Sequence, residues 1–175
     1  MTKSTTLSFT VILALLLLTI AACTTRQVDH IVITPQLTPR KQLIGNGVSM
    51  LVPFNYSKSE MLNGFQTANK ESSISVSTST ADIEEMKASY SAEKLKEQRA
   101  DLIELSTIAY GDSSEGFFAK TYEEQTSSFQ YVLAIQREGK TYLMKAECPD
   151  TTHNSYDYKI RQSLLSVHIG DDLKG

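Results

Sequence analysis

The N-terminal part of the chain is an apolar block that follows a single basic residue. Apolar residues dominate from Leu7 to Ala22, after Lys3, and small residues end the block. A secretion signal has a basic start, an apolar stretch of about 7–15 residues and a small-residue cleavage site. The block is shorter than the roughly 20 apolar residues of a membrane-spanning helix. We therefore predict a signal peptide over residues 1–22, with an uncleaved transmembrane helix as the alternative.

Alternation of apolar and polar residues marks three later stretches as strands. Residues 73–80 alternate with serines on one side, which indicates a half-exposed strand of an antiparallel sheet. Residues 129–137 and 141–148 also alternate, and Gly139 lies in the turn between them. One face of the last two strands carries Phe129, Tyr131, Leu133, Ile135, Tyr142, Met144, Ala146 and Cys148. These stretches predict a hairpin within a meander.

Four shorter stretches complete the predicted sheet. They are residues 48–52, 64–68, 106–110 and 117–123, which contain β-branched or aromatic residues. An Asn-Gly pair supports a turn before the first of these strands, because both residues tolerate positive φ.

The best helical pattern covers residues 92–105. Leu95 and Leu102 lie near one stripe of such a helix and the charged residues lie mostly elsewhere, which indicates one buried face. Two shorter helical segments are also predicted. One is a single turn in residues 57–62, which has the spacing of a capping box. The other is a short acidic helix capped by Thr80, with acidic residues in its first turn.

The last helix is predicted for residues 156–168. Ile160 and Leu164 belong to its apolar stripe, and Asn154 or Ser155 can cap its start. A glycine shortly after this stretch can end the helix.

These elements give the following organisation. We predict a signal peptide over residues 1–22, a tether over 23–44, one α+β domain over 45–170 and a tail over 171–175. The domain has an antiparallel sheet flanked by helices. Within the tether, residues 28–33 could add an edge strand, or the whole tether could be a flexible link.

The charge distribution argues against nucleic-acid binding. The chain has 17 basic and 20 acidic residues, and the predicted signal peptide contributes only one of them, a lysine. The basic residues are scattered, and Arg40-Lys41 is the longest run, whereas nucleic-acid binding needs a clustered positive face. Arg40-Lys41 could contact anionic lipid. The length after residue 22 is sufficient for one domain with its own core.

The chain contains no arrangement of residues typical of catalysis or metal binding. His30, His153 and His168 are far apart, and none has the spacing H-x-x-x-H. Cys148 and His153 flank a short loop, but a zinc site needs further ligands, and a core thiol with a surface histidine is the alternative. The sequences G-x-S-x-G, G-x-G-x-x-G and the P-loop are absent. We predict no catalytic residues, no metal site and no cofactor.

Cys148 has no intramolecular disulfide partner if Cys23 is modified. A free cysteine is often buried as a small hydrophobic residue. A reactive thiol would need a pKa lowered by nearby positive charge or by a helix N-terminus. We predict that Cys148 is a buried structural thiol.

Tyrosines are candidates for an interaction surface, because each combines an apolar ring with a polar hydroxyl. The two strongest candidates are Tyr56, in the loop after Pro53, and Tyr156, near the start of the last helix. The alternative is that these rings only pack against the sheet.

A ligand pocket between sheet and helix is a second hypothesis. It rests on the methionine and aromatic residues Met50, Phe54, Phe65, Phe117 and Met144. The alternative is that these residues fill the core.

Residues Ile20-Ala21-Ala22-Cys23 resemble the lipobox of bacterial lipoproteins. In that family an aliphatic residue and two small residues precede an invariant cysteine, whose thiol receives lipid before the chain is cut in front of it. Ile20 stands where leucine is commoner. The resemblance implies that Cys23 is the first mature residue and carries lipid such as palmitate. More than one acyl chain gives stable anchoring.

The resemblance also implies a location in the bacterial cell envelope. In lipoproteins of Gram-negative bacteria, Asp after the cysteine commonly favours retention in the inner membrane. Thr24 occupies that position here. In a Gram-negative cell we therefore expect the periplasmic face of the outer membrane.

The order of predicted elements resembles the PsbP-like fold over about residues 45–169. The resemblance rests on residues 48–54, where a strand runs into Pro and a large residue, and on residues 142–149, which precede the last helix. The loop after Pro53 often carries Trp in such domains, and this chain has no Trp. The resemblance implies an α/β/α sandwich with an antiparallel sheet between helices. A fold alone does not carry function.

Together, these observations lead to one main functional hypothesis. We expect a membrane-anchored envelope lipoprotein that is not an enzyme and that binds or supports another protein. The alternative is an envelope protein that binds a small ligand or a lipid.

Overall fold

The structure, a computed structural model, describes residues 37–38, 40–111 and 114–170 of the chain. Its elements are, in chain order, β1 (Gln42–Gly45), β2 (Val48–Met50), β3 (Tyr56–Lys58), β4 (Gly64–Thr67), β5 (Ser73–Ser79), α2 (Ile83–Ala88), α3 (Ala92–Glu97), β6 (Ala100–Tyr110), β7 (Ser114–Glu123), β8 (Ser128–Arg137), β9 (Lys140–Pro149), the 3-10 helix η1 (Asp150–Thr152), α4 (His153–Leu165) and β10 (His168–Ile169). The predicted signal peptide, Cys23, the possible strand at 28–33 and the tail at 171–175 lie outside the described residues.

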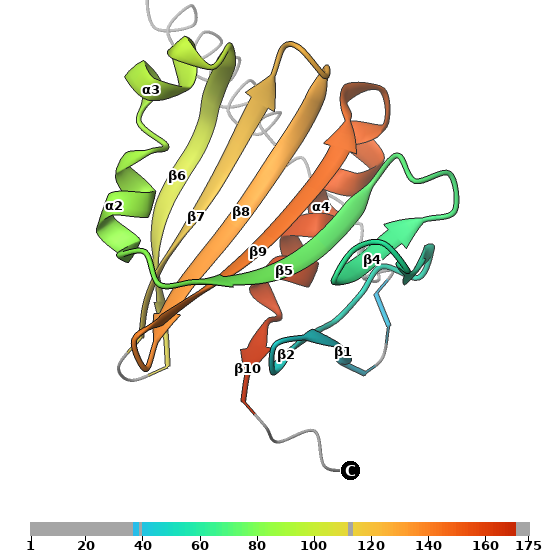
Figure 1. Cartoon of the computed structure of the whole chain (residues 1–175). Helices are drawn as coiled ribbons and strands as arrows, with labels where there is room; N and C mark the ends of the chain where they lie inside the picture. The colour runs from blue at the N-terminus through green and yellow to red at the C-terminus, as the bar shows by residue number, and fades with distance from the viewer. Residues whose placement is uncertain (1–36, 39, 112–113, 171–175) are drawn as a thin grey trace, which may run out of the picture. The chain divides into compact units, whose positions relative to one another are not determined.

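The strands form two antiparallel sheets (Figure 1). The large sheet has seven strands in the order β3-β4-β5-β9-β8-β7-β6, and the small sheet has three in the order β1-β2-β10. Every named strand pair is antiparallel. With α2, α3 and α4 packed against the large sheet, the structure confirms the predicted α+β class.

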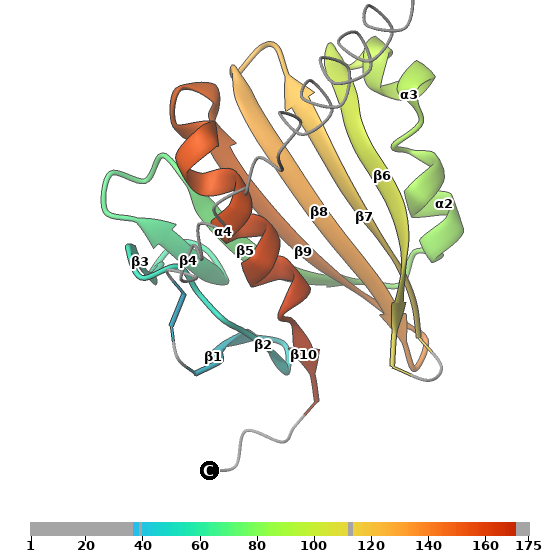
Figure 2. The ribbon, with the colours of Figure 1, turned by 180° about the vertical axis from the view of Figure 1, so that it is seen from behind.

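The back face of the large sheet, which is toward the viewer in Figure 2, is covered by α4. Tyr131, Leu133 and Ile135 of β8 are buried on this face, and so are Ile160 and Leu164 of α4. Residues of the small sheet join the same hydrophobic cluster. The main core therefore lies between the large sheet, α4 and the small sheet, and the apolar face predicted for β8 and β9 is confirmed.

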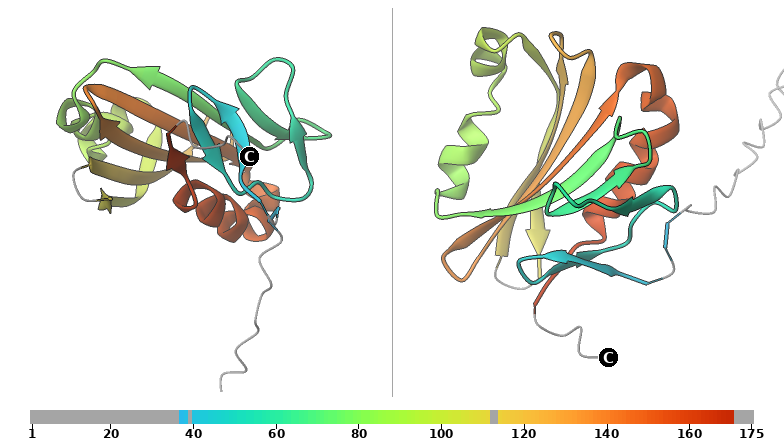
Figure 3. Two further views of the ribbon diagram at one scale, coloured as in Figure 1. Left: turned by 90° about the horizontal axis from the view of Figure 1, so that it is seen from below. Right: turned by 45° about the vertical axis from the view of Figure 1, so that its right-hand side comes forward.

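The front face of the large sheet, toward the viewer in Figure 1, carries α2 and α3 over part of its width. Ile83 of α2 packs with Phe117 and Val132 in a second, smaller hydrophobic cluster. Helix α2 contacts β7 and β8, and α3 contacts β6. Because each of these helices has only 6 residues, the front of β5 and β9 has no described helix over it (Figures 1 and 3).

Local sequence signals placed the hairpin and several strands correctly. Glu138 and Gly139 have φ values of 53° and 74°, as in a two-residue type I′ turn, and they join β8 to β9 as predicted. The strands predicted near residues 64–68, 73–80 and 117–123 are confirmed as β4, β5 and β7.

The helix predicted for residues 92–105 is wrong beyond its first turns. Helix α3 ends at Glu97, Arg99 has a positive φ of 56°, and β6 begins at Ala100. Residues of β6 alternate between half-buried and exposed, a period of two that the leucine spacing also allows. Helix propensity is a weak local preference. Here the pairing of β6 with β7 along its length outweighs it.

The two shorter helical predictions also need correction. The turn predicted at 57–62 is not a helix: residues 57 and 58 belong to β3, and the Ser59 hydroxyl accepts hydrogen bonds from the backbone N–H groups of Met61 and Leu62. The acidic helix exists as α2, but Asp82 rather than Thr80 caps it, because the Asp82 carboxylate accepts from two backbone N–H groups of the first turn.

The last helix begins and ends earlier than predicted. Helix α4 starts at His153, directly after η1, and its N-cap residue Thr152 makes no side-chain capping bond. Asn154 and Ser155 therefore lie inside the helix instead of capping it. The helix ends at Leu165, and residues 168–169 form β10, whose pairing with β2 is a tertiary contact that the helical pattern does not contain.

The folded part of the chain includes residues that the sequence analysis placed in the tether. Residues 42–44 belong to β1, and Ile44 is buried in the main core. Leu37 forms an isolated antiparallel bridge with Pro53. The chain is therefore packed against the domain from residue 37 onward, apart from residue 39, which is not described.

Candidate functional site

The front face of the large sheet is polar where α2 and α3 do not cover it. Three cross-strand pairs lie side by side on β5 and β9. Their members are all exposed or half-buried. We call these residues the open strip: Ser73, Ser75, Ser77, Leu143, Lys145 and Glu147. The strip offers hydroxyl, ammonium and carboxylate groups along two neighbouring strands.

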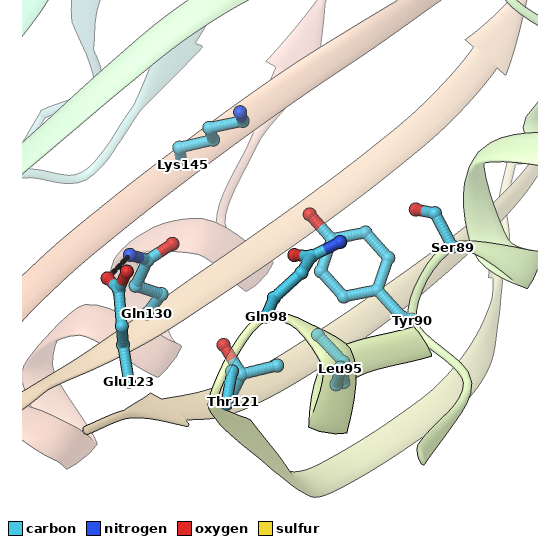
Figure 4. Close-up of a pocket in the computed structure, with 9 residues that line it drawn as sticks. Ser89, Tyr90, Leu95, Gln98, Thr121, Glu123, Gln130 and Lys145 are labelled. Atoms are coloured by element: carbon cyan, nitrogen blue, oxygen red, sulfur yellow. Dashed lines mark hydrogen bonds between the residues drawn. The ribbon is translucent and has the colours of Figure 1, made fainter. Parts of the chain in front are cut away.

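A pocket of about 230 Å³ adjoins the open strip, and Lys145 belongs to both. In Figure 4, side chains of the α2–α3 segment and side chains of the large sheet surround it. The lining residues are Ser89, Tyr90, Leu95, Gln98, Ala100, Thr121, Glu123, Gln130 and Lys145. The volume is below the roughly 300–1,000 Å³ of sites for drug-sized ligands.

The walls of this pocket are mostly polar. The Gln130 amide donates a hydrogen bond of 2.7 Å to the Glu123 carboxylate. The Tyr90 ring packs at 5.5 Å from the ring of Phe117, and burial raises the pKa of Tyr90. The Tyr90 hydroxyl therefore stays protonated at neutral pH. Neither histidine nor cysteine lines the pocket, so its groups suit hydrogen bonding to a small polar group.

A polar network lies on the back face, between β7, β8 and α4. The Asp157 carboxylate is 2.7 Å from the Lys120 ammonium, and it accepts a 2.8 Å hydrogen bond from the Tyr131 hydroxyl. Burial acts to raise the pKa of Asp157, but the hydrogen bonds from Lys120 and Tyr131 outweigh it, so this pKa lies below its usual range. Burial and the hydrogen bond to Asp157 raise the pKa of Tyr131.

A second ion pair links the same helix to the edge strand. The Arg161 guanidinium of α4 binds both oxygens of the Glu104 carboxylate of β6, at 2.5 and 2.8 Å. This hydrogen bonding lowers the pKa of Glu104. Arg161 also lies over the Phe118 ring, 4.8 Å from its centre. These contacts fix α4 on the sheet, so we assign them a structural role.

Cys148 is a buried thiol, as predicted from its sequence position. It has no exposed surface, and burial raises the pKa of the Cys148 thiol to about 11. His153 does not act on it directly: its ring stacks on Phe129 at 3.8 Å, and Nε2 lies 3.3 Å from Asp157 without forming a hydrogen bond. At neutral pH the thiol is protonated, so the pair lacks the thiolate that a nucleophile requires.

The two tyrosines predicted for an interaction surface lie next to each other. Their ring centres are 6.0 Å apart in an edge-to-face arrangement. Tyr56 is 8% exposed and its hydroxyl contacts that of Ser72, so its ring belongs to the core. Tyr156 is half-buried and accepts a 2.7 Å hydrogen bond from the Asn55 amide. Of the pair, Tyr156 retains surface for contact with a partner.

The methionine and aromatic residues considered for a ligand pocket do not form one. Met50, Phe65 and Met144 are buried in the main core, whereas Phe117 is buried in the smaller core on the other face of the sheet. Phe54 is 65% exposed. None of them lines the pocket described above. A second hollow, of about 370 Å³, lies where β7 begins and β8 ends. None of these five residues lines it either; its lining is Ser114, Glu115, Gln136, Arg137 and Glu138.

Within the described ranges, no three histidine, cysteine or acidic side chains are grouped so as to hold a metal ion. In the same part of the chain, none of the helices has both the length and the apolar character that crossing a membrane requires. Cys23, the predicted lipidation site, is outside these ranges.

The described part of the chain has a PsbP-like fold. It is similar to the cyanobacterial PsbP protein (CyanoP) of Synechocystis sp. PCC 6803, with a TM-score of 0.52 and 11% identity, over 79% of this chain and 95% of that protein. LpqN, involved in cell envelope biogenesis of Mycobacterium tuberculosis, gives a TM-score of 0.48 and 12% identity over 70% and 83%. No protein-family model and no curated protein sequence matches the chain. At 11% identity the likeness to CyanoP concerns the fold alone.

Sequence reasoning missed both the pocket and the network. The pocket combines residues that follow α2, residues in or next to α3 and residues of four strands, and no local motif connects them. The network had one usable signal. Lys120 lies in the strand 117–123, among residues that the strand pattern buries, and a lysine there requires an acidic partner.

Proposed function

We propose that this protein is a non-enzymatic accessory module of the bacterial cell envelope that binds another envelope protein. The proposed anchor is lipid on Cys23, in the sequence Ile20-Ala21-Ala22-Cys23. The membrane is then one partner, and the bound protein is the other. With Thr24 after the cysteine, the outer membrane is the proposed location in a Gram-negative cell.

The open strip is the observation that supports protein binding. It is a mostly polar surface two strands wide, with no described helix lying over it (Figure 3), although Leu143 at its border packs against the smaller hydrophobic cluster. Its serine side chains are short and both donate and accept hydrogen bonds, while Lys145 and Glu147 supply one charge of each sign. Such a surface can follow a partner's backbone closely at a low cost in side-chain entropy.

A small polar ligand is the second candidate, and the pocket beside the strip favours it. The polar walls and the volume of about 230 Å³ suit a small hydrogen-bonding group better than an acyl chain. This changes the ligand hypothesis from the sequence, which placed the pocket among residues that fill the two cores.

Site-specific photo-cross-linking in the native cell tests the proposed surface. A photo-reactive amino acid at position 77, in the open strip, is compared with one at position 158, on α4. Tyr158 is 44% exposed and lies two residues after Tyr156 on α4. We expect one defined protein adduct from position 77 and none from position 158. An adduct from position 158 alone would transfer the binding surface to the exposed side of α4 and contradict the open strip.

The anchor is tested separately with Cys23→Ser. The variant is expected to leave the membrane fraction while the domain still unfolds cooperatively in urea. If it stays in the membrane through an uncleaved N-terminal helix, the proposed lipid anchor is wrong.

A further inference from the structure

The segment before β4 differs from the rest of the described chain in its exposed apolar residues. We call the described residues between 37 and 63 the N-terminal layer. Half of the exposed large hydrophobic side chains among the described residues belong to it: Leu43, Phe54, Met61 and Leu62. Single exposed apolar residues are ordinary on a protein surface, whereas neighbouring exposed apolar residues mark interaction sites.

Three parts of the N-terminal layer are held together. Leu37 bridges to Pro53, next to Phe54. The backbone of Gly45 lies against the side chain of Asn63, where a Cβ atom would collide. The Asn63 amide also donates a 3.1 Å hydrogen bond to the Val76 carbonyl of β5, which fixes the β3–β4 loop. The exposed apolar side chains therefore come from neighbouring loops and from β1.

The N-terminal layer also differs in charge. It contains the basic residues Arg40, Lys41 and Lys58 and one acidic residue, Glu60, all exposed. The remaining described residues contain eleven basic and fifteen acidic residues. A net positive layer on an otherwise net negative domain is complementary to anionic lipid headgroups.

The chain enters the domain in this layer. Residue 37 is the first described residue, and it pairs with Pro53. The segment from Cys23 to Leu37 spans at most about 50 Å when fully extended. An anchor at Cys23 therefore keeps the domain close to the bilayer, and the N-terminal layer is the part nearest to it along the chain.

We propose that the N-terminal layer rests on the lipid bilayer, with Phe54 and Met61 entering the headgroup region and Arg40, Lys41 and Lys58 contacting lipid phosphates. This inference rests on the proposed lipid anchor. Apolar side chains flanked by basic residues are the combination that holds a protein at an anionic membrane surface. Strands β1 and β2 of the layer pack into the core on the α4 face of the large sheet and β3 is its edge strand, whereas α2 and α3 lie on the other face (Figure 1). The pocket then lies on the side away from the membrane.

Vesicle co-sedimentation tests the contact without the anchor. The mature chain carrying Cys23→Ser is mixed with vesicles of phosphatidylcholine alone or of phosphatidylcholine and phosphatidylglycerol in equal amounts. We expect binding to the mixed vesicles, weakened by salt. Replacing Phe54 and Met61 together by Ser should weaken this binding at least about tenfold, because two apolar side chains no longer enter the interface.

The matched control is Ile103→Ser. Ile103 is 53% exposed on β6, the opposite edge of the large sheet from β3, and its loss should leave vesicle binding unchanged. Urea unfolding of each variant checks that the domain is still folded. Unchanged binding of the Phe54 and Met61 variant, or equal loss with Ile103→Ser, overturns the proposal.

A third outcome also overturns it: self-association in solution that disappears with the Phe54 and Met61 replacement, which would make the layer a contact between two copies. Because the vesicle assay uses a chain without lipid, its failure is distinguishable from failure of the Cys23 anchor, which is measured by fractionation in cells.

Discussion

The back face of the large sheet is closed by α4 and the small sheet, whereas its front face is open over β5 and β9. The same strands build both faces, because successive side chains of a strand point to opposite sides. On β8, Tyr131 and Leu133 are buried in the main core on the back face. Gln130 of the same strand lines the pocket on the front face. The comparison indicates that stability resides mainly on the back face and that packing constrains the uncovered part of the front face less.

Thiol reactivity gives the largest expected difference between the faces. Cys148, on the back face, should react with a disulfide reagent at pH 8 at least about a hundredfold more slowly than a cysteine introduced on the front face by Ser77→Cys. Burial and a pKa of about 11 leave little accessible thiolate at Cys148, whereas position 77 is exposed. Colour release from Ellman's reagent in the Cys23→Ser chain measures both rates. Equal reaction rates of the two thiols in the folded chain would contradict the difference in accessibility between the two faces.

Core truncation should also separate the two faces. Leu164→Ala, on α4, is expected to lower the free energy of unfolding by about 2–5 kcal/mol, because a fully buried side chain leaves a cavity. Leu143→Ala removes the same atoms from the half-exposed front face and should cost less than about 1.5 kcal/mol. Urea unfolding measures both. A larger cost at Leu143 would show that the front face carries the stability.

Asp157→Asn tests the ionic network on the back face. The substitution leaves the Lys120 ammonium, only 11% exposed, without its carboxylate partner. Removing one member of a buried pair is strongly destabilising, and because Asp157 is itself partly exposed we expect a loss of about 2 kcal/mol. The double variant with Lys120→Met should recover part of this loss, since no unpaired charge remains. No recovery would mean that Asp157 acts through some other contact.

The two ion pairs Lys120–Asp157 and Arg161–Glu104 predict a pH dependence of stability. The pKa values of Asp157 and Glu104 lie below those of the unfolded chain, near 4 for such side chains. Their contribution to stability is therefore present above about pH 4 and is lost as the pH falls through the lower, folded-state pKa values. Urea midpoints between pH 7 and 2.5 should fall less steeply in Asp157→Asn than in the parent chain.

Tyr90→Phe on the front face should have the smallest effect on folding. It removes one hydroxyl at the pocket and keeps the ring on Phe117, so the free energy of unfolding should change by less than about 0.5 kcal/mol. If the pocket binds a partner group, the photo-cross-link from position 77 should weaken in this variant. A large loss of stability would instead assign Tyr90 a structural role.

The parts of the fold that sequence predicted correctly are those governed by nearest neighbours along the chain. Alternation identified β5, β8 and β9, and the Glu138-Gly139 turn set the register of the hairpin. Residues 98–105 were assigned wrongly because their leucines fit both a helix and a strand. Pairing with β7, a contact set by the whole sheet, decides between the two.

The candidate site was less predictable than the fold. Tyr90, Gln98 and Glu123 are brought together by the packing of α2 on β7 and β8 and of α3 on β6, and no spacing in the sequence records this. The burial of Tyr56 also depends on tertiary packing, since Ser72 and Tyr156 close around its ring. By contrast, the burial of Cys148 could be predicted from its place on the apolar face of a strand and from the tendency of free cysteine to be buried.

The position of β9 inside the large sheet has a consequence for the order in which the molecule can assemble. β9 lies between β5 and β8, so it joins the first strands of the sheet to the meander, and Ser79 pairs with Thr141 across a long loop of chain. A chain that emerges N-terminus first cannot complete its sheet until β9 has also emerged. Contacts this distant in sequence slow folding, because the loop must close before they form. The seven-stranded sheet is therefore completed only after residues 140–149 have been synthesised.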